Sequence, residues 1–368
     1  MNKIPVANSL RRASAASPRN AGSPLACLLA ILLASLPLPT SATSPGVVNR
    51  YANIDFDRVS GYGNYDPAAL ANPNVGGVDI MMDWSAVEVQ KGVYNFAPAD
   101  AEAAAWSNAG KSFVIVIRYT NEYPRDCNKP QNLPSWELSR IPHFCDNATG
   151  GLIPDYFDGT FKADFEAYVA AVARHFATSP YRKNLLYVRI GVGLGSEGFY
   201  LRPCRRGRPC DREHGMAQLN AWGFSPGVWK QWQEEMMAFY QAQFSYATVI
   251  YPMVALDVDP ATGNPIHMDV AYWAAARGMG LGALGLRPNF GTGPAQIRPI
   301  MAYVRSHYPH TYIQFQTFVA VHDADEMAQD IEIAKELGGK TIEWYSEDVV
   351  NPAYQNLLSQ WAQEAAPP

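Results

Sequence analysis

The sequence predicts an α/β fold, a single closed (β/α)8 (TIM) barrel, and three observations support this. From residue 47 onward, short β-branched runs alternate with longer Ala-rich amphipathic segments, as in parallel sheets with crossover helices. The alternation yields eight candidate strands, the number that closes such a barrel. At 368 residues, with 48% hydrophobic residues, the chain is long enough for one barrel domain of roughly 250–330 residues.

The expected strands are short runs rich in β-branched and aromatic residues, and they cover residues 51–56, 78–82, 113–119, 185–192, 248–254, 283–287, 312–318 and 341–345. The expected helices between them cover residues 98–109, 162–176, 226–243, 268–278, 295–307 and 323–337. Gly338 and Gly339 follow the last of these helices, as is typical of a helix C-cap.

Two long insertions, residues 120–160 and 197–225, both follow expected strands. In a (β/α)8 barrel the loops after strands form the catalytic face, so we expect both insertions there. No internal repeat, low-complexity tract or linker interrupts residues 43–368, which we expect to form one domain.

Residues 1–42 are typical of a secretory signal peptide. Arg11, Arg12 and Arg19 precede an apolar run over residues 25–38, which leads to a small-residue cleavage site ending at Ala42. A membrane anchor is the competing interpretation, but about 14 apolar residues are few for spanning a bilayer. Cys27 lies inside the run, which disfavours a lipoprotein site. We therefore expect a secreted or periplasmic protein with no stable membrane insertion after cleavage.

Four cysteines remain after the leader, an even number that suits an oxidising compartment. We expect the local pairs Cys127 with Cys145 and Cys204 with Cys210, each closing a loop on the same rim of the barrel. A zinc site is the alternative, although no CxxC pair or nearby His array accompanies these cysteines.

Charge and missing motifs narrow the class of function. The net charge of −5 is spread without long runs, which argues against a nucleic-acid partner. The sequence has no GxSxG, HExxH or P-loop pattern. The GxGxG at residues 191–195 is a weak dinucleotide signal by itself. We expect no cofactor and no metal, and a monomeric protein.

The second expected strand carries the most informative motif. It ends in Asp83 and Trp84, Glu88 follows, and a turn at Lys91 and Gly92 leads to Tyr94 and Phe96. This unit resembles the second βα unit of the barrel glycoside hydrolases, in which a Trp, a Glu and a Gly-x-Tyr-x-Phe turn follow the strand. Val89 stands where that superfamily usually has Pro.

The fourth expected strand ends in a run of small residues followed by Glu197. The resemblance implies that Glu197 is the acid/base residue, because that superfamily places this Glu at the tip of strand four; Ser196 replaces the usual preceding Asn. The alternative is a loop Glu held by backbone amides or by an arginine.

Glycoside hydrolysis usually requires a second carboxyl group. Retaining relatives carry it at the end of strand seven, where this chain has Gln314 and Gln316. Glu343 on the eighth strand is the first substitute, across the barrel from Glu197, at a separation that favours an inverting mechanism. The other candidates are Asp83, Glu122 and Asp257.

A ring of polar and aromatic side chains is expected at the strand ends, where planar hydrogen-bonding groups and ring faces suit carbohydrate. It comprises Asp83, Trp84, Arg118, Tyr119, Tyr251, Arg287, Asn289, Gln316 and Trp344. The resemblance thus implies a glycoside hydrolase acting on a poly- or oligosaccharide. The alternative is a non-catalytic carbohydrate-binding barrel derived from such enzymes. The sugar, the linkage and endo or exo action stay open.

Overall fold

The eight expected strands form a closed parallel barrel in the computed structural model, which describes residues 52–56, 62–120, 126–129, 131–147, 149–202, 212–291 and 297–363. The barrel strands are β1 (Ala52–Phe56), β2 (Gly77–Asp83), β5 (Ser112–Arg118), β8 (Leu185–Arg189), β9 (Thr248–Met253), β10 (Gly280–Leu286), β11 (Ile313–Thr317) and β12 (Thr341–Tyr345). Each pairs with the strands next to it in the sequence of barrel strands, and β1 closes the barrel against both β2 and β12. The (β/α)8 prediction is confirmed.

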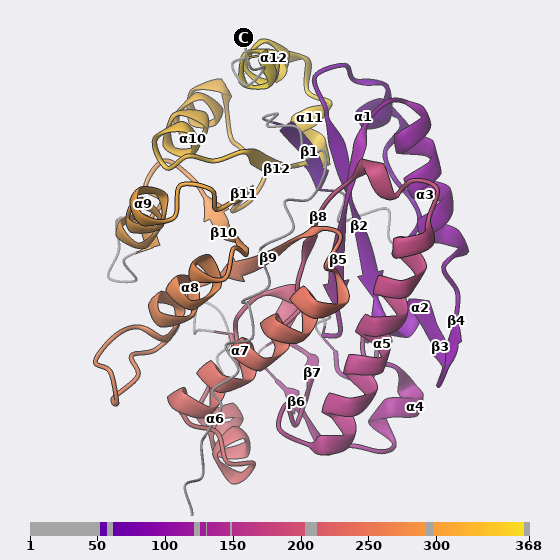
Figure 1. Ribbon diagram of the computed structural model, residues 1–368, viewed down its shortest axis with the longest axis vertical. Helices are drawn as coiled ribbons and strands as arrows, with labels where there is room; N and C mark the ends of the chain where they lie inside the picture. Colours follow the sequence, from indigo (N-terminus) through magenta and orange to yellow (C-terminus); the bar gives the residue numbers. More distant parts are fainter. Residues whose placement is uncertain are drawn as a thin grey trace, which may run out of the picture. The chain divides into compact units, whose positions relative to one another are not determined.

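Helices lie outside the strands (Figure 1). They are α1 (Pro67–Ala71), α2 (Trp84–Val87), α3 (Ala97–Asn108), α4 (Ser135–Leu138), α5 (Gly159–Thr178), α6 (Arg212–Ala221), α7 (Pro226–Gln243), α8 (Ile266–Ala276), α9 (Ile297–His307), α10 (Ala324–Glu336), α11 (Ser346–Val349) and α12 (Gln355–Gln363). Short 3-10 turns cover Arg182–Asn184, Leu194–Ser196 and Pro352–Tyr354. The six predicted helices agree with α3, α5, α7, α8, α9 and α10 within a few residues.

Two antiparallel hairpins lie in the loops that follow β2 and β5. The loop after β2 holds β3 (Glu88–Gln90) and β4 (Val93–Tyr94), and the loop after β5 holds β6 (His143–Asp146) and β7 (Gly151–Pro154). Figure 1 shows β6 and β7 beside α6, and contacts between α6 and β6 agree with the view. These segments lie in the insertions that the sequence predicts at the carboxyl ends of the strands.

Strand alternation separates two sets of side chains. Along β2, Val78, Ile80 and Met82 face outward into the main hydrophobic core beneath the helices, whereas Met81 belongs to the smaller cluster inside the barrel. The same alternation in the other strands fills the lumen with side chains, so the lumen is packed.

Helix starts follow local capping chemistry. Asp158 Oδ1 accepts the N–H groups of Thr160 and Phe161 at the start of α5, and Asp323 caps α10 in the same manner. Ser225 caps α7 just before Pro226. These caps determine the residue at which each outer helix begins.

All described residues belong to one compact unit. In this part of the chain, no helix has the length and apolar character to cross a membrane. The expected leader lies outside the described residues, and its cleavage remains a prediction.

Candidate active site at the carboxyl ends of the strands

An ion pair joins the carboxyl ends of two neighbouring strands, β2 and β5. Arg118 donates from Nε to Asp83 Oδ1 at 2.6 Å and from Nη2 to Oδ2 at 2.8 Å. Both side chains keep contact with solvent, with exposed fractions of 16% for Asp83 and 26% for Arg118. Asp83 makes no side-chain cap to α2, so the guanidinium holds this carboxylate.

Glu197 stands at the end of a strained turn after β8. Gly195 has φ 62° and Ser196 has φ 61°, and Ser196 is the one non-glycine residue at positive φ among the described residues. This conformation costs a non-glycine residue roughly 1–2 kcal/mol, and such strain is concentrated at functional sites. Gly193 is also required, because a Cβ there would lie 2.2 Å from Phe199 O. The backbone that leads to Glu197 is therefore tightly constrained.

Arg202 holds Glu197. Its Nη1 lies 2.7 Å from Glu197 Oε2, and its guanidinium carbon lies 4.7 Å from the ring centroid of Phe199. The side chains of Glu197 and Arg202 are 12% and 6% exposed. The alternative that an arginine holds Glu197 therefore describes this conformation, and sequence analysis had not selected Arg202.

Glu343 lies inside the barrel in a buried polar cluster. It accepts a hydrogen bond from Tyr187 Oη at 2.7 Å and another from Arg189 Nη1. Arg189 also donates to Gln316 Oε1 at 2.8 Å, and its Nη2 lies 3.7 Å from Asp79 Oδ2. The side chains of Glu343 and Asp79 have no exposed surface, and that of Arg189 has 2%.

The three charged groups of this cluster have displaced pKa values. Burial raises the pKa of Asp79 well above its usual range, and the nearby Glu343 adds to the rise. Burial also raises the pKa of Glu343, but Arg189 opposes the effect. Burial alone would lower the pKa of Arg189, and its two acidic neighbours raise it instead. These directions favour a protonated Asp79 beside the ion pair of Glu343 and Arg189.

This placement does not favour the catalytic role expected of Glu343. The inward direction follows from strand alternation, but Glu343 is fully buried and both of its oxygens are bonded. In this conformation it holds Arg189 and does not reach a substrate. Arg189, a charged residue within an expected apolar strand, was the sequence signal for this cluster.

Four expected sugar-binding aromatics belong instead to the core beneath the helices: Trp84, Tyr119, Tyr251 and Trp344, each with an exposed fraction of 0%. Trp84 packs against Phe165 and Tyr168 of α5. Tyr251 Oη donates to Gln233 of α7, and Trp344 Nε1 donates to Asn53 of β1. In this conformation these four side chains pack in the outer core and not in the lumen, and substrate binding by them stays a prediction.

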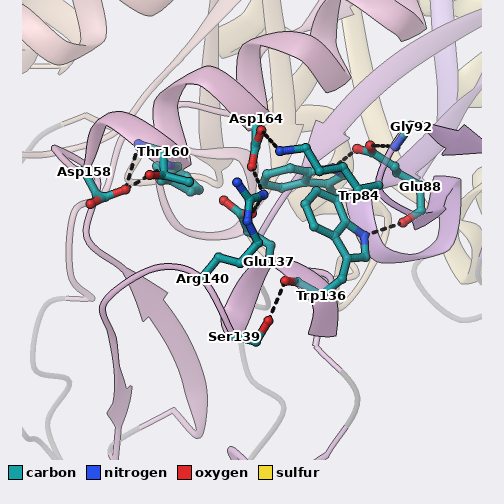
Figure 2. Close-up of polar contacts among 12 residues, drawn as sticks. Trp84, Glu88, Gly92, Trp136, Glu137, Ser139, Arg140, Asp158, Thr160 and Asp164 are labelled. Carbon is teal, nitrogen blue, oxygen red and sulfur yellow. Dashed lines mark hydrogen bonds and ion pairs between the residues drawn. The ribbon is translucent and has the colours of Figure 1, made fainter.

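The Trp-Glu-Gly motif after β2 is structural. Trp84 Nε1 donates to Glu88 Oε2 at 2.6 Å, and the Gly92 amide donates to Glu88 Oε1 at 2.7 Å. Trp136 of α4 donates to the Glu88 carbonyl at 3.1 Å. Figure 2 shows Glu88 between these groups. The carboxylate thus ties the β3–β4 turn to the barrel.

Polar groups remain on the rim at β10 and β11. Arg287 and Asn289 are exposed, and Gln316 is 8% exposed. The Arg287 guanidinium carbon lies 4.5 Å from the ring centroid of Phe318, which is itself 38% exposed. Phe318 was not selected from sequence, although it ends an expected strand.

Two carboxylate candidates remain, Asp257 and Glu122. Asp257 has an exposed fraction of 57% and pairs with Arg212. Glu122 lies outside the described residues.

The disulfide between Cys127 and Cys145 is confirmed. Cys204 and Cys210 lie outside the described residues. In the part of the chain that the structure covers, no group of three or more His, Cys, Asp or Glu side chains is placed to hold a metal ion.

Solved structures with a similar fold are glycoside hydrolases. The endo-β-1,4-mannanase from Thermotoga petrophila superposes with a TM-score of 0.54 at 10% identity, covering 87% of this chain and 77% of that chain. A hyperthermostable endo-1,4-β-D-mannanase from Thermotoga petrophila RKU-1 gives a TM-score of 0.52 at 11% identity, covering 86% and 99%. An exo-β-1,4-mannosidase from an Opitutaceae bacterium gives 0.50 at 10% identity, covering 87% and 61%.

At such low identity the similarity establishes the shared (β/α)8 fold, and the expected resemblance to barrel glycoside hydrolases is confirmed at that level. By sequence, the chain matches no protein-family model and no curated protein.

Proposed function

We propose that this protein is an exported glycoside hydrolase that cleaves O-glycosidic bonds in a poly- or oligosaccharide, with Glu197 as the general acid. One observation carries the proposal. Glu197 follows the Gly195–Ser196 turn in the loop after β8, and the costly backbone conformation of this turn supports a functional role for the loop, because enzymes of this fold bind substrates at the loops after strands.

Asp83 is the better candidate for the second carboxylate, because Glu343 has no contact with solvent. Asp83 ends β2, and only β5 separates β2 from β8 in the barrel. Adjacent strands lie about 4.8 Å apart, so groups at the ends of β2 and β8 are about 10 Å apart at their backbones. Glu197 lies eight residues beyond the end of β8, and the proposal requires this loop to bring its carboxyl group within the range of an inverting pair with Asp83, roughly 6.5–9.5 Å.

In the proposed reaction, Glu197 gives its proton to the glycosidic oxygen as the bond from that oxygen to the anomeric carbon breaks. A water attacks the anomeric carbon from the opposite face and gives its proton to Asp83. Arg118 holds the Asp83 carboxylate toward this water. The products are two sugars, and the new reducing end has inverted configuration.

Hydrolysis of a panel of neutral and charged glycans by the purified protein tests this proposal. We expect activity on at least one glycan, a loss of about 10³-fold or more in Glu197→Gln and Asp83→Asn, and unchanged activity in Glu332→Gln, an exposed residue of α10. NMR of the first product anomer should show inversion. Hydrolysis by Glu197→Gln at the wild-type rate would reject the assignment.

A non-catalytic carbohydrate-binding barrel is the second candidate. It is favoured by Gln314 and Gln316 on β11, the strand on which the resemblance implies a carboxylate in retaining relatives. Gln316 Oε1 accepts a hydrogen bond from Arg189. It predicts glycan binding by wild type and by Glu197→Gln without hydrolysis by either.

Export rests on the predicted leader together with the Cys127–Cys145 disulfide, since disulfides persist in oxidising compartments. We propose a secreted or periplasmic monomer that binds carbohydrate. Amino-terminal sequencing of the mature protein, with Thr43 expected first, and its mass in solution test these points.

A further inference from the structure

Thr120 bonds the turn that leads to Glu197. It lies two residues beyond the end of β5, and its hydroxyl accepts the Gly195 amide at 3.0 Å and donates to the Gly193 carbonyl at 3.4 Å. The residue is 1% exposed, so these bonds lie where water competes with them little. One side chain from the loop after β5 thus spans the glycine-rich part of the turn.

Trp229 holds the backbone on the other side of Glu197. It lies in the first turn of α7, and its Nε1 donates to the Gly198 carbonyl at 3.0 Å. Its ring has no exposed surface and packs against Tyr156 and Tyr200, at centroid distances of 4.9 and 5.7 Å. The side chain that makes this bond is therefore itself held by neighbouring rings.

Glu197 stands between these two contacts, in a segment that folds back on itself. The Leu194 amide donates to the Phe199 carbonyl at 2.8 Å, and the Glu197 amide donates to the Leu194 carbonyl at 3.0 Å. We call residues 193–199 the Glu197 segment. Thr120 and Trp229 join this segment to the loop after β5 and to α7.

A general acid acts only from the right place. It must come within about 2.6–3.2 Å of the atom that takes its proton. A displacement of about 1 Å can lower the rate on the order of 10²-fold, even when its cause lies away from the reacting atoms. Side chains that fix the Glu197 segment therefore bear on proton transfer more than on sugar binding.

We propose that Thr120 and Trp229 are positioning residues, which hold the backbone on either side of Glu197 so that its carboxyl group meets the glycosidic oxygen. This inference rests on the proposed function. Each residue acts through the place that it gives to Glu197, without contact with the sugar.

Amide hydrogen exchange of the Glu197 segment tests the Thr120 contact without any substrate. Thr120→Val keeps the shape of the side chain and removes the hydroxyl, so the Gly195 amide should exchange about tenfold faster. Thr120→Ser keeps the hydroxyl and should stay within about threefold of wild type. Thr178→Val, at the exposed end of α5, is the control and should match wild type.

Aryl glycosides separate proton transfer from general damage to the site. The probes are phenyl and 2,4-dinitrophenyl glycosides of glucose, galactose, mannose and xylose in both anomeric forms. Phenolate needs a proton as it departs, whereas dinitrophenolate departs without one. For a hydrolysed phenyl glycoside, Thr120→Val and Trp229→Phe should lower kcat at least tenfold and change KM by no more than about twofold. For the matching dinitrophenyl glycoside, kcat should stay within about threefold of wild type.

Two further variants control for loss of packing. Trp106→Phe alters a fully buried tryptophan of α3 that packs against Tyr65, and any loss of kcat should be equal for the two leaving groups. Thr120→Ser should restore most of the kcat that Thr120→Val loses on the phenyl glycoside. The same split between kcat and KM applies to any polysaccharide that wild type hydrolyses.

Unchanged exchange of Gly195 in Thr120→Val would overturn the role of Thr120. A variant that loses equally on phenyl and dinitrophenyl glycosides, or that raises KM and keeps kcat, removes its residue from the proposal. These results, with Glu197-dependent hydrolysis by wild type, leave the proposed function standing. If wild type hydrolyses neither glycans nor aryl glycosides, the proposed function itself is rejected, whatever the exchange of the Glu197 segment shows.

Discussion

Arg189 shows how one side chain organises the lumen. It bonds Glu343 and Gln316 from β8, so it links one side of the barrel to the strands opposite. A buried ion pair adds little net stability, but removing one partner leaves an uncompensated charge. Arg189 therefore favours one arrangement of the side chains in the lumen over others.

Arg189→Met should lower the free energy of unfolding by ~3–5 kcal/mol, since Glu343 would then be buried without a cation. Urea denaturation followed by circular dichroism measures the loss. Arg298→Met, which breaks a partly exposed pair, should cost no more than ~1 kcal/mol.

The double variant Arg189→Met/Glu343→Leu should recover much of the lost stability, because it removes both charges. If Arg189→Met were as stable as wild type, the ion pair would not hold the lumen together.

At the scale of elements, the two acidic residues Asp164 and Glu137 connect the loops after β2 and β5 to α5. Asp164 of α5 bonds Lys91 of the β3–β4 turn at 2.7 Å and also bonds Arg140, which follows α4 (Figure 2). Glu137 of α4 has a fully buried side chain beside Asp164. Burial raises the pKa of Glu137 to about 8, and Asp164 adds to the rise.

The contact between Glu137 and Asp164 should weaken at alkaline pH. The unfolded chain loses the Glu137 proton near pH 4.5, whereas the folded protein keeps it to about pH 8, so the stability it adds is lost as pH rises through about 8. Hydrogen exchange of α4, corrected for the intrinsic rate, should be about tenfold faster at pH 9.5 than at pH 6.5.

Glu137→Gln keeps a donor to Asp164 and removes the titration, so its corrected exchange should not change over this range. Glu332→Gln serves as the control and should follow wild type. A pH response that persists in Glu137→Gln would assign the effect to another group.

Elements were predictable where a periodic pattern determines them, whereas the contacts that candidate site residues make were not. Alternation along β12 predicts that the Glu343 side chain points inward. How deeply that side chain lies in the barrel depends on the stagger of neighbouring strands. Trp84 was found through its motif, yet its role depends on α5, which follows much later in the sequence. Arg202 lies in an insertion without a period, so no pattern indicated its contact with Glu197.

For the whole molecule, two buried carboxyl groups make the free energy of unfolding depend on pH. Burial raises the pKa values of Asp330 on α10 and Asp348 on α11 to about 7. Glu326 adds to the rise at both sites, and Glu347 adds to it at Asp348. The Asp348 carboxylate also accepts the Val321 amide, which opposes the rise.

The protein should therefore lose stability as pH rises from about 4 to about 7, because the unfolded chain releases these protons first. A pKa displaced from 3.8 to about 7 corresponds to at most ~4 kcal/mol. Asp330→Asn should match wild type at pH 4 and have a higher Tm at pH 8, as measured by calorimetry. A difference in Tm that does not depend on pH would contradict this assignment.

The closure of the barrel has a consequence for biosynthesis. Because β1 pairs with β12, the first barrel strand to be synthesised can form this pairing only after the last strand has been synthesised. A chain that stops before residue 345 leaves the edges of β1 and β11 unpaired. For the export proposed above, this late pairing would keep the barrel from closing until the last strand has been synthesised.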